Sequence, residues 1–128
     1  MMQAESIRKD QYTIVKLANE KLDATISGEM KATFVTNFQD GEKNVIFDMS
    51  QVRYCDSSGL SSILIGNRLA TEKEGSFVLC GLSDHVAKLI HISQLDTVLS
   101  IVPTLEEAVD LVLFNEIEKQ LRADSQED

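Results

Sequence analysis

The sequence predicts a single α/β domain in which helices pack on a mixed, mainly parallel β-sheet. Short runs rich in β-forming residues alternate along the chain with longer segments whose apolar residues recur every three or four positions. The 128 residues, 43% of them hydrophobic, are enough for one core, and no linker, repeat or low-complexity block divides them. We therefore expect one domain over residues 1–128, with its core at about 11–121.

The first half of the chain predicts a strand, a helix and a second strand. Residues 11–17 are rich in β-formers, and residues 44–49 form a short apolar run typical of a strand covered on both faces. Between them, residues 24–38 are expected to be helical, because four large apolar side chains recur at every fourth position. These side chains are Ile26, Met30, Phe34 and Phe38.

The middle of the chain continues the alternation. An apolar, strand-like run ends at Cys55, and a helix is expected to follow Asp56 and to stop near Gly75. Residues 76–81 predict a strand, and Ser83 with Asp84 has the composition of a helix start.

The last strand is expected at residues 97–102, where Pro103 ends it. Thr104 and Glu107 have the spacing of a capping box for a final helix. Apolar residues cover more than one face of that helix, so core packing is the default interpretation and contact with a second subunit or partner stays open. Its apolar residues include Leu105, Ala108, Val109, Leu111, Val112, Leu113, Phe114 and Ile117. We expect residues 123–128 to be a frayed acidic tail.

The charge balance restricts the classes of partner. Twenty-one acidic and 12 basic residues give a formal net charge of −9, which repels phosphate backbones and anionic lipid headgroups. Nucleic acid is therefore an improbable partner. No apolar run approaches the ~20 residues that span a bilayer, so we expect a cytoplasmic protein without membrane insertion.

The cysteines and histidines give no indication of a metal or cofactor. Cys55 and Cys80 each lie in an apolar, strand-like run without a CxxC motif, so we expect buried, reduced side chains. His85 and His91 have no carboxylate or thiol at ligand spacing, and surface or boundary roles are expected for both. We expect no bound cofactor.

The most distinctive stretch is Asp56–Leu60, which joins a strand-like run to a helix-like one. Its acid and hydroxyl side chains suit a helix N-cap, which also presents hydroxyls at the surface where another protein could modify one. Leu22-Asp23-Ala24 lies at a similar junction before the first helix. Functional groups of open α/β sheets usually collect at such strand ends. The residue pattern alone leaves open whether Asp56–Gly59 is only a capping turn.

The chain resembles the STAS domain of bacterial anti-sigma factor antagonists. The resemblance is carried by Tyr54–Leu60, with its Asp-Ser-Ser-Gly core, between the strand-like runs Val45–Asp48 and Phe77–Ser83. Leu22–Ala24 matches the element before the family's first helix, and Val86–Asp96 matches the segment after its next strand. The resemblance covers roughly residues 11–112 in the same order.

The resemblance implies a phosphorylation-switched binding module and not an enzyme. In the family, the serine after the motif aspartate is phosphorylated by an anti-sigma factor with serine kinase activity and restored by a metal-dependent serine phosphatase. Carried across by position, the acceptor is Ser57. The unphosphorylated form would bind the anti-sigma factor and release a sigma factor for transcription. The docking surface would lie at or beside Asp23, Asp56, Ser58, Gly59 and Leu60. We expect a monomer or a weak homodimer.

The chain departs from the family pattern at three positions, where glycine is frequent. Ser61, Asn19 and Gln94 occupy them here. The departures leave the phosphoacceptor in place but open the identity of the partner. The same domain also serves in stress-signalling complexes and as a non-catalytic accessory subunit of lipid transporters.

Other classes of protein fit the residues less well. A response-regulator receiver would use Asp48 as acceptor, but it needs an acidic pair after the first strand and a lysine after a late strand, and neither is present. A serine hydrolase would need Gly-x-Ser-x-Gly, whereas Ser57 is preceded by Cys55-Asp56. An acyl carrier protein is all-helical, which the β-rich runs contradict. We therefore expect Asp48 to be a strand-end or turn residue.

Overall fold

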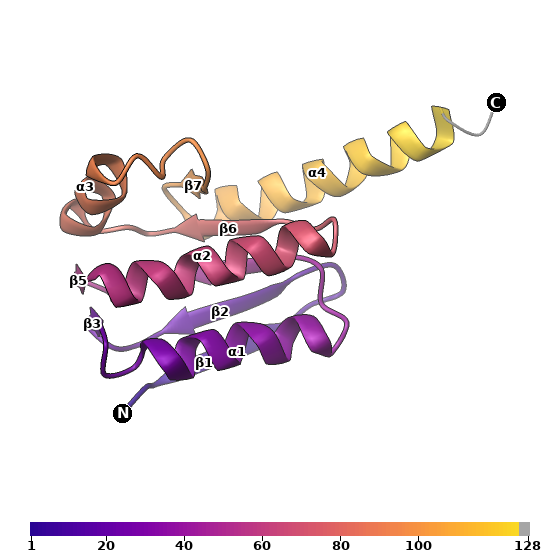
Figure 1. The fold of residues 1–128 in the computed structure, drawn as a ribbon. Coiled ribbons are helices and arrows are strands. Elements are labelled where there is room, and N and C mark those ends of the chain that lie inside the picture. The colour runs from indigo at the N-terminus through magenta and orange to yellow at the C-terminus, as the bar shows by residue number, and fades with distance from the viewer. Residues whose placement is uncertain (126–128) are drawn as a thin grey trace.

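Five strands form the central sheet, in the spatial order β1-β2-β4-β6-β7 (Figure 1). The computed structural model describes residues 1–125. The strands are β1 (Ala4–Arg8), β2 (Thr13–Leu17), β4 (Val45–Asp48), β6 (Phe77–Cys80) and β7 (Ser100–Val102). β1 pairs with β2 in antiparallel register, while β2, β4, β6 and β7 run parallel. The predicted α/β class with a mixed, mainly parallel sheet is confirmed.

A second, two-stranded sheet lies at one end of the molecule. Its strands, β3 (Lys21–Leu22) and β5 (Tyr54–Cys55), pair in parallel, with Lys21 opposite Tyr54 and Leu22 opposite Cys55. The strand-like run before Asp56 therefore belongs to this small sheet and not to the central one. Together β3 and β5 connect the loop that follows β2 with the segment that leads into α2.

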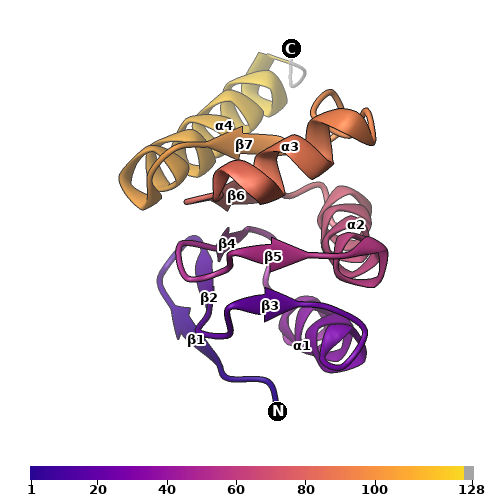
Figure 2. The ribbon, with the colours of Figure 1, turned by 90° about the vertical axis from the view of Figure 1, so that its left-hand side faces the viewer.

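Helices cover both faces of the central sheet (Figure 2). They are α1 (Ser27–Gln39), α2 (Ser57–Glu72), α3 (Asp84–Ile92) and α4 (Leu105–Ser125). α1 and α2 lie side by side on one face and share its core with α3, whereas α4 packs on the opposite face against β4, β6 and β7. Since β4 lies between these two layers, all four of its residues are buried, as predicted for a strand covered on both faces.

Three phenylalanines form the centre of the larger core. Phe34 of α1 contacts Phe47 of β4 and Phe77 of β6, each with ring centroids 5.2 Å apart in an edge-to-face arrangement. Such pairs add stabilisation beyond the buried area of the rings. α1 is thus held against the middle of the sheet by the stripe that its four-residue apolar spacing predicted.

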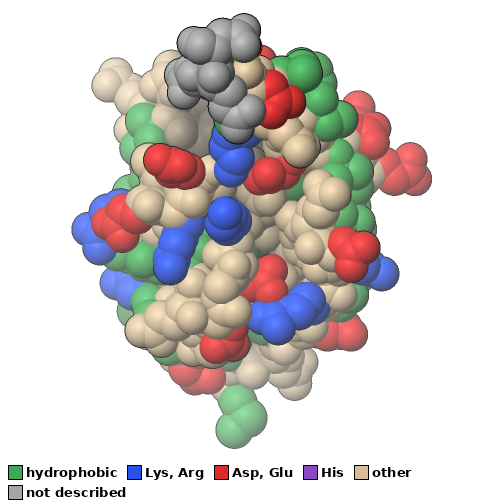
Figure 3. All heavy atoms as spheres, turned by 90° about the vertical axis from the view of Figure 1, so that its right-hand side faces the viewer, with side chains coloured by type: hydrophobic (Ala, Val, Ile, Leu, Met, Phe, Trp, Pro, Cys, Tyr) green, Lys and Arg blue, Asp and Glu red, His purple; other side chains and the backbone are tan. Residues whose placement is uncertain are grey.

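A buried asparagine, Asn44, stabilises the end of the central sheet that is farthest from β3 and β5. Asn44 Nδ2 donates to the Gln11 carbonyl (2.8 Å) and to Glu116 Oε1 of α4 (2.9 Å), while its Oδ1 accepts from the Ser76 amide (2.8 Å). Figure 3 shows this end of the molecule, where basic and acidic side chains intermingle on the surface. The hydrogen bonds of Asn44 join the starts of β2, β4 and β6 to α4, and its bond lowers the pKa of Glu116.

Several predicted element boundaries were wrong. The first helix begins at Ser27 and not at residue 24, because residues 24–26 form a turn. The amides of Thr25 and Ile26 bond back to Asp23, and the amide of Ala24 bonds to the Asp56 carboxylate. The last strand begins at Ser100, because the amides of Val98 and Leu99 bond back to the Leu95 carbonyl in a turn.

The two ends of the chain also differ from expectation. β1 was not predicted, because as an edge strand with mostly exposed residues it has no apolar pattern. α4 continues through Ser125, so residues 123–125 are helical and not frayed. Residues 126–128 lie outside the described part of the chain. Only Ala108 and Val112 of α4 are buried, and Phe114 and Ile117 are exposed, so core packing accounts for only part of its apolar surface.

Candidate functional site

The candidate site lies at the end of the molecule where β4 and β6 finish and α1 and α2 begin. This end is at the left of Figure 1 and faces the viewer in Figure 2, with β3 and β5 at its centre. Both sequence junctions identified as candidates, Leu22–Ala24 and Asp56–Leu60, meet here because β3 pairs with β5. Backbone N–H groups of the first helical turns are directed to this surface.

Asp56 joins the two junctions through its carboxylate. It is the N-cap of α2 with an extended backbone, and its Oδ1 accepts a hydrogen bond from the Gly59 amide at 2.9 Å, which confirms the predicted cap. Its Oδ2 accepts from the amide of Ala24 at 3.3 Å, in the loop before α1. The second bond could not be read from the sequence, because Ala24 is 32 residues away.

The four serines of this segment differ in accessibility. Ser57, the first residue of α2, is exposed, whereas Ser58 and Ser61 are partly buried. Ser62 is fully buried, and its hydroxyl donates to the Gly59 carbonyl at 2.6 Å. A modifying enzyme needs access to the hydroxyl that it modifies, so accessibility favours Ser57 among the four.

Gly59 and Leu60 lie beneath the surface and not on it. Gly59 is buried, and a Cβ atom there would lie 2.1 Å from the Leu22 carbonyl oxygen and 2.8 Å from Cys55 Sγ. Leu60 is 8% exposed and belongs to the core. Gly59 and Leu60 therefore pack inside the first turn of α2, while Asp23, Asp56, Ser57 and Ser58 keep exposed surface.

Asp23 organises the turn before α1. Its Oδ1 accepts from both the amide and the hydroxyl of Thr25, and its carbonyl oxygen accepts from the amides of Ile26 and Ser27. The hydrogen bonds from Thr25, the hydroxyl above all, lower the pKa of Asp23 because they favour the charged carboxylate. The site therefore presents a fixed negative charge at neutral pH.

Replacing Thr25 with alanine is expected to raise the pKa of Asp23 towards its ordinary value of 3.8, because the hydroxyl donor is lost. A depressed folded-state pKa stabilises the fold above the unfolded-state pKa, and this contribution disappears as pH falls through the folded-state value. The difference in stability between wild type and Thr25→Ala should accordingly shrink below about pH 4. Carboxyl NMR titration and acid unfolding measure both effects.

Thr71→Ala is the matched control, because the Thr71 hydroxyl on α2 donates to the Asn67 carbonyl and touches no carboxylate of the site. An unchanged Asp23 pKa in Thr25→Ala, or an equal rise in Thr71→Ala, would contradict the assignment.

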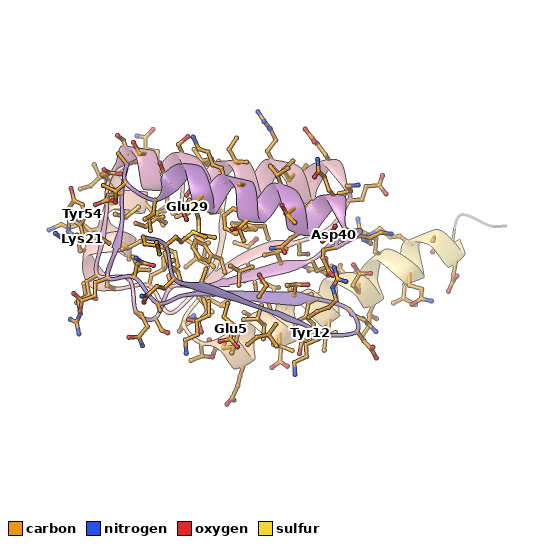
Figure 4. The ribbon with its side chains drawn as sticks, turned by 90° about the horizontal axis from the view of Figure 1, so that it is seen from below. Glu5, Tyr12, Lys21, Glu29, Asp40 and Tyr54 are labelled. Atoms are coloured by element: carbon orange, nitrogen blue, oxygen red, sulfur yellow. The ribbon has the colours of Figure 1, made fainter. Side chains whose placement is uncertain are left out.

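Tyr54, Arg53 and Lys21 also lie at this end, and no local sequence pattern predicts that they share one surface. Tyr54 stacks on His85 of α3 with ring centroids 5.3 Å apart and is 43% exposed. Figure 4 shows Tyr54 and Lys21 together at this end of the molecule. Arg53 Nε lies 3.8 Å from Glu20 Oε1. Exposed aromatic side chains and arginine are enriched in protein–protein interfaces.

The two cysteines are free and buried, as predicted. Burial raises the pKa of Cys55 to about 12, with a further contribution from Asp56, and raises that of Cys80 to about 12, with a contribution from Asp48. Neither thiol is therefore a reactive thiolate at neutral pH.

The histidines and Asp48 have the roles that the sequence indicated. His85 and His91 are exposed, and His91 Nδ1 lies 2.9 Å from Asp96 Oδ2. Asp48 is the last residue of β4, where its Oδ1 accepts from the Ser50 amide at 3.0 Å, which confirms a strand-end role. Within residues 1–125, no three His, Cys, Asp or Glu side chains gather in a group that could hold a metal ion.

Comparisons with known proteins agree with this architecture. The sequence model of the STAS domain family matches residues 3–108. The protein BtrV of Bordetella bronchiseptica is 29% identical over 65 residues, which are 51% of this chain and 56% of BtrV, so the match spans little more than half of that relative. The anti-sigma-B factor antagonist of Staphylococcus aureus is 25% identical over 91 residues, which are 71% of this chain and 83% of that protein.

A solved structure extends the comparison to three dimensions. The phosphorylated form of the Bacillus cell fate determinant SpoIIAA superposes with a TM-score of 0.66 at 25% identity, covering 88% of this chain and 99% of SpoIIAA. Among the described residues, no helix has the length and apolar character needed to cross a membrane.

Proposed function

The chain belongs to the STAS domain family, and we propose that it is an anti-sigma factor antagonist switched by phosphorylation of Ser57. The observation that carries the proposal is that Ser57 is exposed at the first position of α2, next to the Asp56 cap. The names of the relatives support the general function, and the solved phosphorylated form of SpoIIAA supports the mode of regulation.

The helix N-terminus accounts for a phosphate being accepted without unfolding. A phosphoryl group on Ser57 adds about −1.5 to −2 charge, where the α2 dipole and free amides favour an anion. We therefore expect the fold to stay the same after phosphorylation, with the effect of the modification confined to the surface.

The same phosphate acts against binding. It stands beside Asp56 on a protein of net charge −9, so it repels acidic groups of a partner. It also occupies a close-packed contact and must lose water when the interface forms. Phosphorylation therefore blocks the complex by local charge and volume.

The proposed partners are an anti-sigma factor with serine kinase activity and a serine phosphatase that restores the hydroxyl. The anti-sigma factor contacts Asp23, Asp56, Ser57 and Ser58, while Gly59 and Leu60 support the first turn of α2 from the core side. Bound to the unphosphorylated protein, it releases its sigma factor for transcription. The protein has no catalytic step of its own, acts in the cytoplasm without cofactor, and is a monomer or a weak homodimer.

Mass spectrometry of the protein from its own cells tests the acceptor. We expect one phosphate that phosphatase treatment removes and that peptide analysis assigns to Ser57. Ser57→Ala should carry none, whereas Ser58→Ala, the matched control one position along, should be phosphorylated as wild type. A phosphate that persists in Ser57→Ala and disappears in Ser58→Ala would show that Ser58, and not Ser57, is the acceptor.

The absence of phosphate under all conditions, together with co-purification of membrane transporter subunits, would instead favour the accessory-subunit function of the domain.

Ser57→Asp tests the switch itself. Because residue 57 is exposed at a helix N-terminus, the free energy of unfolding of the Ser57→Asp variant should differ from that of the wild type by less than about 1 kcal/mol. Recovery of the anti-sigma factor with tagged protein from the native cells should fall by about tenfold or more for Ser57→Asp and stay at the wild-type level for Ser57→Ala. Equal recovery with both variants would refute a switch based on charge.

A further inference from the structure

α4 carries an apolar stripe on the side that faces away from the sheet. Phe114, Ile117 and Leu121 follow one another at helical spacings of three and four, so they share one face. They are 58%, 58% and 62% exposed, whereas the buried Ala108 and Val112 are on the side packed on the sheet. The stripe therefore adds nothing to the core, and exposed apolar clusters of this kind mark interaction sites.

Acidic side chains surround the stripe. Three exposed acidic residues share the helix face of Phe114. Glu107 precedes Phe114 by seven residues, Asp110 precedes it by four, and Glu118 follows it by four. Arg122 is paired with Glu118 at 3.9 Å. The remaining cation, Lys119, is bonded to Glu116 (3.1 Å) and to the Glu74 carbonyl on the sheet side.

The acidic charge around the stripe indicates which kind of partner binds this face of α4. A second copy would bring the same acidic face against this one, on a chain of net charge −9, and an anionic lipid surface would be repelled for the same reason. We propose that the outer face of α4, from Glu107 to Leu121, docks a basic amphipathic helix of a partner protein. The partner places apolar side chains on Phe114, Ile117 and Leu121 and lysine or arginine on Glu107, Asp110 and Glu118.

This surface is separate from the Ser57 site. α4 lies on the face of the sheet opposite α1 and α2, and its second half runs beyond the end of the sheet, away from the start of α2, where Ser57 lies (Figure 1). A partner on α4 therefore leaves Ser57 and the start of α2 accessible. The proposal does not depend on the function proposed for Ser57, and either can fail alone.

A synthetic helical peptide tests the proposal. The probe is an amphipathic peptide of about 18 residues with leucine on one face and lysine on the other, measured against the full chain by calorimetry at about 50 mM and about 300 mM salt. We expect saturable one-to-one binding that weakens with salt. Phe114→Ser with Ile117→Ser should weaken it about tenfold or more, and Asp110→Asn with Glu118→Gln several-fold.

The controls separate a docking site from general attraction to an acidic protein. Glu29→Gln with Asp40→Asn removes two exposed charges, one from α1 and one from its C-cap, on the other face of the sheet (Figure 4), and should leave binding unchanged. All substituted side chains are exposed, so folding is preserved. Equal loss in this control, or unchanged binding in the Phe114 and Ile117 variant, would overturn the proposal.

The oligomeric state gives the remaining outcome. Sedimentation velocity should show no dimer that depends on the stripe. A wild-type dimer that dissociates in Phe114→Ser with Ile117→Ser would assign the surface to a second copy and overturn the assignment to a basic partner helix.

Discussion

Replacing Gly59 with alanine is expected to destabilise the fold by about 3 kcal/mol. The added Cβ would lie 2.1 Å from the Leu22 carbonyl oxygen and 2.8 Å from Cys55 Sγ, distances that real Cβ atoms essentially never show. Leu22 and Cys55 form the β3–β5 pair, so neither can move without opening the small sheet beside the start of α2. Chemical denaturation with an unchanged slope measures the loss.

Gly28 provides the matched control for Gly59. It also lies in the first turn of a helix, α1, but a Cβ atom there would meet nothing within 4 Å. Gly28→Ala should therefore be neutral or stabilise the protein by about 0.5–1 kcal/mol, since alanine favours the helix and restricts the unfolded chain. Equal effects of the two substitutions would show that the contact with Leu22 does not limit residue 59.

Phe34→Ala is expected to cost about 3–5 kcal/mol of unfolding free energy. The side chain is fully buried, and both of its edge-to-face contacts, with Phe47 and Phe77, are lost together. Alanine leaves a cavity between α1 and the middle of the sheet that neither neighbouring ring can fill without leaving its own position. Thermal or denaturant unfolding monitored by circular dichroism measures the change.

Phe114→Ala is the control for the same chemical change on the surface. Because Phe114 is 58% exposed and outside both cores, its loss should change the unfolding free energy by no more than about 0.5 kcal/mol. A cost comparable to that of Phe34→Ala would mean that the outer face of α4 is packed in solution, and would contradict its description as an open docking surface.

The pattern of the central elements was predictable because each has a local cause. The stripe through Met30 and Phe34 predicted α1, the apolar run of β4 predicted a strand covered on both faces, and Asp56 predicted the cap of α2. Each depends on residues within a few positions of one another, for which helical and strand periodicity are reliable guides. β1 has no such pattern, since its residues are mostly exposed.

The candidate site was predictable as a motif but not as a surface. The sequence and its resemblance to a family indicated Ser57, whereas the exposure that distinguishes Ser57 from the buried Ser62 depends on how α2 lies on the sheet. Tyr54 and His85 belong to different elements, and only the packing of α3 beside β5 stacks them. No local pattern contains that contact.

The fold class, the central strands and helices, the capping turn at Asp56 and the family of the chain could be inferred from the residues alone, because they depend on local spacing and residue type. Three features could be learned only from the folded chain: the Asp56 carboxylate also binds the Ala24 amide, Leu22 leaves no room for a side chain at Gly59, and Phe114 faces solvent. These facts depend on the pairing of β3 with β5 and on which side of α4 meets the sheet. Such long-range contacts follow from the folding of the whole chain and leave no periodic trace in the sequence.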